Sequence, residues 1–364
     1  MSESMKFSTD AKDIWEAPWP MDGLEALNNC PICGDSQRKN LYDGLVDNTF
    51  FCAPGKWSLW SCISCSVAYL DPRPSPATIS LAYEKYYTHT KDNISQSSYE
   101  DLRKFRKLRR RLVNGYTNWR FGTKEENANA LGVIIALLIP FVRKPIDNRY
   151  RNLPKRDKNG SRLLDLGCGN GTFLKTARNC GWDVVGVDPD PKAVREAQDN
   201  GFEVHHGSID IFAGQKDLFD FICMSHVIEH LHDPIKTLAD CHRILKPGGT
   251  IWIETPNIDS FGCQYFGINW RGLETPRHLV IQSSKSLAFS LKKSGFYAIS
   301  WLRDKNVYRG MFKKSYEMSK DCSPNESLPL PIKFACRAYK AKYLGLFFVG
   351  RREFLIITAR KPKT

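Results

Sequence analysis

Two pairs of cysteines near the N-terminus have the spacing of metal ligands. Cys30 and Cys33 form one Cys-x-x-Cys knuckle, and Cys62 and Cys65 form a second one further along the chain. Two such knuckles are the usual donors of a tetrahedral zinc site made of four thiolates. Four protein ligands leave no open position on the metal, so we predict a structural zinc ion. The alternative is a set of redox-active or metal-free thiols.

A glycine-rich turn in the middle of the chain has the pattern of a ligand-binding loop. Gly167 and Gly169 directly follow a short apolar stretch that carries Asp165. Glycines let the backbone approach a ligand without interference from a Cβ atom. Asp165 can receive an ammonium group, and Asp188, at the end of the next apolar stretch, can accept both hydroxyls of a ribose. The spacing predicts a nucleotide-type site, and the alternative is an ordinary turn between a strand and a helix.

The elements that must position these residues alternate between strand and helix from residue 161 onwards. Such alternation predicts an α/β fold with a mainly parallel sheet and helices on both faces. The expected strands are 162–167, 183–188, 203–207, 219–226, 250–256, 297–303 and 353–361. The expected helices include 172–180, 191–201 and 283–295.

The glycine turn, Asp188, the segment 219–234 and the Leu-Lys-Pro-Gly-Gly stretch at 245–249 together resemble the class I S-adenosylmethionine (SAM)-dependent methyltransferases. The resemblance covers residues 161–303 and the final strand. It implies a seven-stranded Rossmann-like sheet whose last strand is antiparallel. It also implies that SAM is bound by residues at the ends of the first four strands. These are Asp165, Gly167, Cys168, Gly169, Asp188, Ser208, Ile209 and Ser225.

The segment after the fifth strand is similar to a narrower, bacterial branch of this family. Thr255-Pro256-Asn257, Trp270, Pro276 and His278-Leu279 follow its pattern, and the branch often carries N-terminal cysteine knuckles. Its members methylate sugars, glycolipids and related metabolites. The resemblance therefore implies O-methylation of a sugar, a glycolipid or a lipid-linked glycan intermediate. The alternatives are methylation of a polyprenylated or quinone-type small molecule, an RNA methyltransferase and, ranked last, a catalytically silent binding domain.

Three histidines are candidates for the base that a hydroxyl acceptor needs. His226 ends the fourth strand, His230 is expected one turn into the next helix on the same face, and His278 follows the fifth strand. An imidazole close to the acceptor oxygen can take its proton. The alternative for His230 is a packed helix residue, and for His226 and His278 it is a role in lining the pocket.

Two absences disfavour methylation of a nucleic-acid base. The Asn/Asp-Pro-Pro-aromatic box of exocyclic-amine methyltransferases is replaced here by Ser225-His226-Val227-Ile228. The Pro-Cys and Thr-Cys dipeptides that often carry a nucleophilic cysteine do not occur in the chain. We therefore treat nucleic acid as an unlikely partner and a small-molecule or lipid-linked acceptor as the expected one.

Positive charge is concentrated in two helical insertions. The chain has 53 Lys and Arg against 39 Asp and Glu, a net charge of +14, and the excess lies in residues 101–160 and 301–364. Both segments also hold apolar stretches, such as residues 130–142. Basic amphipathic segments of this kind can lie in the interface of an anionic membrane. The alternative is that they cover the acceptor site.

The composition and the motifs divide the chain into six segments. The expected boundaries are a lead-in (1–29), a zinc-knuckle subdomain (30–100), a basic helical segment (101–160), the SAM-binding core (161–303), a basic insertion (304–352) and the final strand (353–364). The N-terminus lacks the basic and apolar regions of a secretory signal. The longest apolar run is shorter than the ~20 residues of a membrane-spanning helix. We expect a cytoplasmic protein, with peripheral contact at the inner face of the cytoplasmic membrane as an open possibility.

Overall fold

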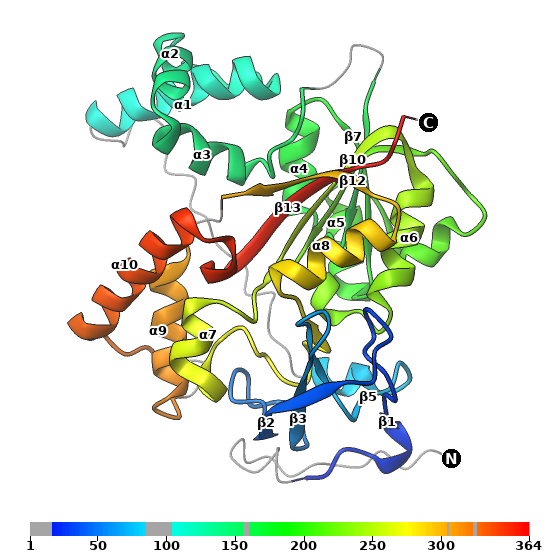
Figure 1. Ribbon diagram of the computed structural model, residues 1–364. Helices are drawn as coiled ribbons and strands as arrows, with labels where there is room; N and C mark the ends of the chain where they lie inside the picture. The colour runs from blue at the N-terminus through cyan, green and yellow to red at the C-terminus, as the bar shows by residue number, and fades with distance from the viewer. Residues whose placement is uncertain (1–16, 85–103, 156–159, 304–305, 323–325, 364) are drawn as a thin grey trace.

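A computed structural model describes residues 17–84, 104–155, 160–303, 306–322 and 326–363 (Figure 1). Its centre is a seven-stranded sheet with the strand order β12-β13-β10-β9-β6-β7-β8. The strands are β6 (Arg162–Leu166), β7 (Asp183–Asp188), β8 (Glu203–His206), β9 (Phe219–Ser225), β10 (Leu245–Pro256), β12 (Tyr297–Leu302) and β13 (Phe354–Arg360).

The direction of these strands confirms the predicted fold class. Strands β6 to β10 run parallel to their neighbours, whereas the final strand β13 inserts between β10 and β12 and is antiparallel to both. The sheet is therefore the mixed seven-stranded sheet of a class I methyltransferase fold.

Helices cover both faces of the sheet, because each strand places its alternate apolar side chains on opposite faces. One face packs against α4 (Thr172–Asn179) and α5 (Pro191–Asp199), together with α1 (Lys104–Phe121). The other face packs against α6 (Pro234–Ile244) and α8 (Ser284–Lys293). Helix α5 begins at Pro191, whose preceding residue Asp190 accepts a hydrogen bond from the amide of Lys192.

The N-terminal cysteine region forms a small antiparallel sheet that the core completes. Its order is β11-β4-β3-β2, with β2 (Arg38–Leu45), β3 (Trp57–Cys62), β4 (Ala68–Leu70) and β11 (Val280–Ile281). Beside it, β1 (Leu24–Glu25) pairs with β5 (Arg73–Pro74). Strand β11 comes from the stretch that directly follows His278. The small sheet therefore joins the cysteine region to the segment expected to line the acceptor site.

The two basic segments are helical, as expected. Helices α1, α2 (Leu131–Leu138) and α3 (Pro140–Arg149) precede the sheet, and Figure 1 shows them grouped at one end of the molecule. Helices α9 (Tyr308–Met318) and α10 (Ile332–Phe347) lie between β12 and β13 and pack against α7 (Phe261–Phe266). Within the described residues, no helix is long and apolar enough to cross a membrane.

Candidate active site

The glycine turn leaves an open backbone surface at the end of β6. Gly167 and Gly169 have φ angles of +75° and +53°, in the left-handed region that favours glycine. A Cβ atom on Gly167 would lie 2.4 Å from Cγ2 of Val227, whereas one on Gly169 would meet no atom within 4 Å. The turn is thus pressed against the end of β9 on one side and open on the other, which is what a bound nucleotide requires.

Asp188 is fixed beside this turn by backbone amides. Its Oδ2 accepts a hydrogen bond from the amide of Gly169 (2.7 Å), and its Oδ1 accepts one from the amide of Asp190 (2.9 Å). The amide of Gly207 donates to the Asp188 carbonyl (3.0 Å), which brings the residues after β8 to the same edge. The carboxylate predicted to hold a ribose is therefore preorganised next to the glycine turn.

Ser208 and Ile209 follow at this edge of the sheet. Ser208 caps the short 3-10 helix η5 (Ile209–Phe212) by accepting a hydrogen bond from the amide of Asp210. Ile209 is buried in the core between the sheet and α6, and Cys168 is buried inside the turn, with Gly186 next to its sulfur. The hydrogen bond from Gly207 thus brings the backbone at Ser208 and Ile209 to the same edge of the sheet as Asp188.

Asp165 carries a buried oxygen that has no partner. Its Oδ1 lies 2.5 Å from Nη1 of Arg151, which also lies 3.1 Å from the sulfur of Cys223. Its Oδ2 is buried and accepts no hydrogen bond from any described residue. Burial raises the pKa of Asp165, while the Arg151 guanidinium acts against that rise. An orphaned carboxylate oxygen beside a guanidinium fits the ammonium and carboxylate groups of the methionine part of SAM.

Arg151 was not predicted from the sequence. It follows α3 in the chain, has a φ angle of +46°, and its guanidinium lies 3.8 Å from the ring centroid of Phe173. Burial alone would lower the pKa of Arg151, but pairing with Asp165 holds it above its usual value. No motif surrounds this arginine in the sequence, so its position could not be derived without the fold.

The end of β9 differs from its expected form. His226 has a φ angle of +56°, and Glu229 and His230 lie in a 3-10 turn, η6 (Ile228–His230), before α6 begins at Pro234. The prediction that His230 lies one turn into a helix was therefore wrong. The left-handed residue breaks the helical path, and Asp233, which caps α6, delays the helix start by several residues.

His226 and Glu229 form a hydrogen-bonded pair beside the glycine turn. Oε1 of Glu229 accepts a hydrogen bond from Nδ1 of His226 (3.2 Å), and Oε2 accepts one from Oγ1 of Thr255 (3.0 Å). Burial would raise the pKa of Glu229, but the hydrogen bond from His226 and the neighbouring histidines lower it to about 2. Because an ionised carboxylate can only accept, Nδ1 carries the proton and Nε2 carries the lone pair. His226 is 42% exposed, while the Glu229 side chain is fully buried.

Ser225 lies next to this pair, at the last position of β9. Its hydroxyl donates to Oε2 of Glu254 (3.2 Å), and the amide of His226 donates to the Glu254 carbonyl (2.9 Å). These bonds tie the end of β9 to β10. They fix the backbone of His226 and of the next residue, Val227, whose side chain lies against Gly167.

His278 and His230 form a second, more buried cluster. His278 is 4% exposed and its Nδ1 donates to the Gly272 carbonyl (2.8 Å), and the two imidazole rings lie 4.8 Å apart. Nδ1 of His230 lies 3.0 Å from both the Arg277 carbonyl and the hydroxyl of Tyr83. Burial lowers the pKa of His278 to about 4, so this imidazole is neutral at pH 7. The structure thus separates His226, which is exposed, from His278, which is buried.

The second cluster has the spacing of a metal site. One ligand atom from each of Glu229, His230 and His278 lies within 4.8 Å of the others. Both histidines hold Nδ1 against a backbone carbonyl, which leaves the Nε2 side of each ring as the one that could face an ion. This grouping could not be predicted from the sequence, because His278 lies far from Glu229 and His230 in the chain.

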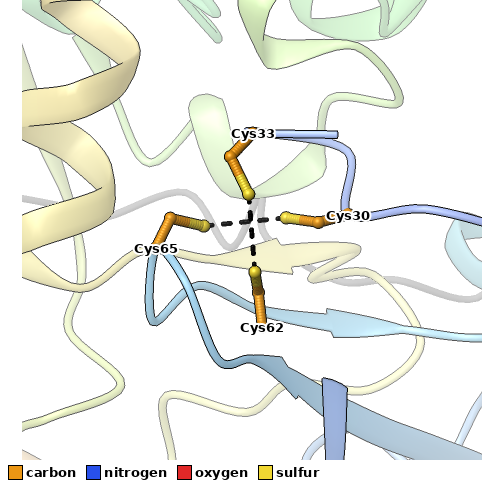
Figure 2. A group of neighbouring side chains, drawn as sticks. All are labelled: Cys30, Cys33, Cys62 and Cys65. Carbon is orange, nitrogen blue, oxygen red and sulfur yellow. Dashed lines mark hydrogen bonds between the residues drawn. The ribbon is translucent and has the colours of Figure 1, made fainter. Parts of the chain in front are cut away.

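The four knuckle cysteines come together around one point (Figure 2). The Cys30 and Cys65 sulfurs are 3.6 Å apart, and those of Cys33 and Cys62 are 3.5 Å apart. Tetrahedral zinc with Zn–S bonds of about 2.3 Å requires sulfurs about 3.8 Å apart, so the cluster fits the ion closely. The hydrogen bond between Cys30 and Cys65 lowers the pKa of the Cys30 thiol to about 5 and raises the pKa of the Cys65 thiol well above its usual value, so Cys30 is the member of the pair that is a thiolate.

Comparisons with known proteins agree with this geometry. Residues 140–300 match a family model described as a methyltransferase domain. A ubiquinone biosynthesis O-methyltransferase from Aromatoleum aromaticum is 35% identical over 105 residues, which cover 27% of this chain and 45% of that protein. The human mitochondrial ubiquinone biosynthesis O-methyltransferase is 31% identical over 135 residues, covering 33% and 36% respectively. The chain thus matches less than half the length of these curated relatives.

Among solved structures, a SAM-dependent methyltransferase from Archaeoglobus fulgidus is similar to this chain. It has 21% identity and a TM-score of 0.43, over 64% of this chain and 100% of that one. The strand order and the antiparallel β13 are those of the class I methyltransferase fold, and the match of residues 140–300 to a methyltransferase domain agrees with that fold. The names of these two relatives belong to the quinone-type class of acceptor, which is one of the alternatives above, and not to the sugar or glycolipid class.

Proposed function

We propose that this protein transfers a methyl group from SAM to a hydroxyl oxygen of a phenol- or quinol-type small molecule. The observation that carries the proposal is the His226–Glu229 pair, which lies at the end of β9 directly beside the open glycine turn. The names of the curated relatives support the same class of acceptor.

The cofactor residues have distinct tasks in this proposal. Asp188 would accept hydrogen bonds from the ribose hydroxyls, and Gly169 would lie against the cofactor. Ser208 and Ile209 would flank the adenine. The unpartnered oxygen of Asp165 would receive the ammonium group, while Arg151 would face the carboxylate. Bound SAM supplies a sulfonium methyl group that an aligned nucleophile can displace. The protein contributes alignment and removal of a proton.

The acid–base chemistry of the pair suits a phenol better than a sugar. Nε2 of His226 can take the hydroxyl proton, and the buried carboxylate of Glu229 stabilises the imidazolium that forms. A phenol has a pKa of about 10. A sugar hydroxyl is a weaker acid than a phenol, because it has no aromatic ring to delocalise the negative charge. Each pKa unit is worth about 1.4 kcal/mol, so an imidazole can deprotonate the phenol at far lower cost.

We also propose that the cysteine cluster holds one structural zinc ion. Four thiols whose sulfurs all lie within 4.8 Å of one another, buried or half-buried and not joined as disulfides, support this assignment. The ion would fix the two knuckle loops against α8, where Lys293 donates a hydrogen bond to the Ile32 carbonyl (3.0 Å).

Transfer of a radiolabelled methyl group from SAM to a panel of acceptors tests the function. We expect labelling of a catechol-type quinol precursor, and not of free sugars or transfer RNA. Calorimetry should show that the chain binds SAM and that Asp188→Ala weakens binding, because each charge-assisted hydrogen bond is worth about 1.5–3 kcal/mol. Labelling of a sugar alone would return the assignment to the glycan interpretation. No SAM binding by the wild-type chain would rule out a methyltransferase.

A further inference from the structure

Helices α2 and α3 carry a continuous run of large apolar side chains that face solvent. Within the described residues, this is the densest such run along the chain. We call it the apolar ridge: Leu131, Ile134, Leu137, Leu138, Ile139, Phe141 and Val142 are all more than 40% exposed, and Leu138 and Phe141 reach 76% and 69%. A folded protein does not gain from exposing so many large apolar groups together, which marks the ridge as an interaction surface.

The ridge is held rigidly by the crossing of α1 and α2. A Cβ atom on Gly132 would lie 1.8 Å from the Leu112 carbonyl oxygen, and one on Gly115 would lie 1.9 Å from the Asn129 carbonyl oxygen. Only glycine allows the two backbones to come this close. The small contact side of α2, which also holds buried Ala136, leaves the large side chains to point outward.

The same crossing places positive charge beside the ridge. The amide of Asn129 donates to the Arg111 carbonyl (2.8 Å), so the basic half of α1 lies next to the start of α2. Arg106, Arg109, Arg110 and Arg111 are exposed there. At the other end of the ridge, the Arg303 guanidinium lies 5.5 Å from the ring centroid of Phe141. Burial, together with Arg303, Arg143 and Arg352, lowers the pKa of Lys144.

Acidic groups do little to offset this charge. The described residues 104–155 contain three carboxylates: Glu125, Glu126 and Asp147. Asp147 accepts a hydrogen bond from the Tyr116 hydroxyl (2.7 Å) and lies 3.6 Å from Arg143. The surface around the ridge is therefore strongly cationic.

We propose that the apolar ridge inserts into the headgroup region of an anionic phospholipid bilayer, with the arginines of α1 at the lipid phosphates. Branched aliphatic side chains and a phenylalanine suit the boundary between headgroups and acyl chains, and cations next to them are attracted to anionic lipid. A nucleic acid would bind the positive charges through its phosphates, but it would gain nothing from the uncharged apolar ridge. Because no described helix could cross a membrane, this contact would be peripheral. The proposed membrane contact depends on neither SAM binding nor methyl transfer.

Co-sedimentation of the full-length chain with vesicles tests the proposal. Vesicles of phosphatidylcholine mixed with phosphatidylglycerol should bind the protein, and vesicles of phosphatidylcholine alone should bind it far less. The double variant Ile134→Ser/Leu138→Ser should weaken binding roughly thirtyfold or more, because two large apolar side chains can no longer be buried in the headgroup region. The double variant Arg106→Gln/Arg109→Gln should weaken it roughly thirtyfold, because it removes two cations that attract anionic lipid.

Two control variants change apolar side chains of similar exposure, and remove the same number of positive charges, at other places on the surface. Met21→Ser/Ile268→Ser alters side chains that are 83% and 52% exposed, against 76% and 54% for Leu138 and Ile134. Lys192→Gln/Arg195→Gln removes two exposed cations from α5. Both controls should bind like the wild type, and melting curves should show that all variants fold.

Three results would overturn the proposal. The ridge variant could bind mixed vesicles as well as the wild type does. Sedimentation velocity could show a dimer that the ridge variant abolishes, which would make the ridge an interface between two copies of this chain. Binding to RNA could exceed binding to vesicles and depend on the arginines but not on the ridge.

Discussion

Glu229 is the residue on which the proposed chemistry depends most. Its carboxylate is fully buried, accepts hydrogen bonds from His226 and Thr255, and is ionised because its pKa is lowered to about 2. It is a positioning residue, since it acts on the acceptor through His226. The sequence placed His226, Glu229 and His230 close together, but it did not indicate which histidine the carboxylate would orient.

We expect Glu229→Gln to reduce kcat by about tenfold to a hundredfold, the value of one charge-assisted hydrogen bond. The amide can still fill the space, but it cannot stabilise an imidazolium, so the acid limb of the pH–rate profile should move to lower pH. His226→Ala should cost about 10²–10⁴ in kcat, with SAM affinity unchanged. An unaltered kcat and pH profile in both variants would remove this pair from the reaction.

His278 makes the stability of the protein depend on pH. Its folded-state pKa is about 4 because it is buried, and its pKa in the unfolded chain is about 6.5. Between these values the unfolded state binds a proton that the folded state does not, so this contribution to the free energy of unfolding falls as the pH falls. The loss is complete near the folded-state value and amounts to up to about 3 kcal/mol.

Urea unfolding of the wild type and of His278→Asn at pH 7 and at mildly acidic pH measures this effect. The asparagine amide can still donate to the Gly272 carbonyl but does not titrate. The wild type should therefore lose more stability on acidification than the variant does. Equal losses would mean that His278 does not titrate on unfolding.

At the scale of single elements, the cysteine knuckles show how far sequence spacing can lead. The spacing alone proposed the ligand set, and the structure brings all four sulfurs within 4.8 Å. The strands of the core were equally clear, because their apolar runs end at glycines and acidic residues. The turn after β9 was misread, since a single left-handed residue, His226, decides it.

Elemental analysis should give one zinc per chain, and Cys33→Ser should lose the metal together with a large part of the stability of the N-terminal sheet. A thiolate cannot be replaced by a hydroxyl in a four-thiolate site without a large loss of affinity. Cys336→Ser alters an exposed cysteine on α10 and should keep both the zinc and the stability. Full zinc content in Cys33→Ser would refute the ligand assignment.

At the scale of the whole molecule, a buried ion pair connects the N-terminal region to the core. Nη2 of Arg277 lies 2.5 Å from Oδ1 of Asp47, and both side chains are fully buried. Asp47 also accepts hydrogen bonds from the amides of Phe50, Cys52 and Ala53. Contacts between residues so far apart in the sequence cannot be predicted from the spacing of motifs. The sequence analysis therefore set a boundary near residue 100 but could not show how the N-terminal region contacts the core.

We expect Asp47→Ala to lower the free energy of unfolding by up to about 3–5 kcal/mol, because it removes the closer of the two carboxylates from the buried Arg277, which keeps only Glu274 at 3.5 Å. Asp22→Ala, which removes an exposed carboxylate from the same N-terminal region, should cost far less. Chemical denaturation of the two variants makes the comparison. A small loss in Asp47→Ala would show that the two regions are held together by apolar packing instead.

Strand β11 has a consequence for the way the protein is made. Residues 280–281 supply the edge strand that covers β4, and the Leu279 carbonyl accepts a hydrogen bond from the amide of Leu70 (3.0 Å). During synthesis, the first three strands of this sheet leave the ribosome some two hundred residues before their fourth neighbour. Until then the β4 edge is unpaired, and unpaired edges invite association with other chains. A nascent chain that stalls within the core should therefore be the form most dependent on chaperones.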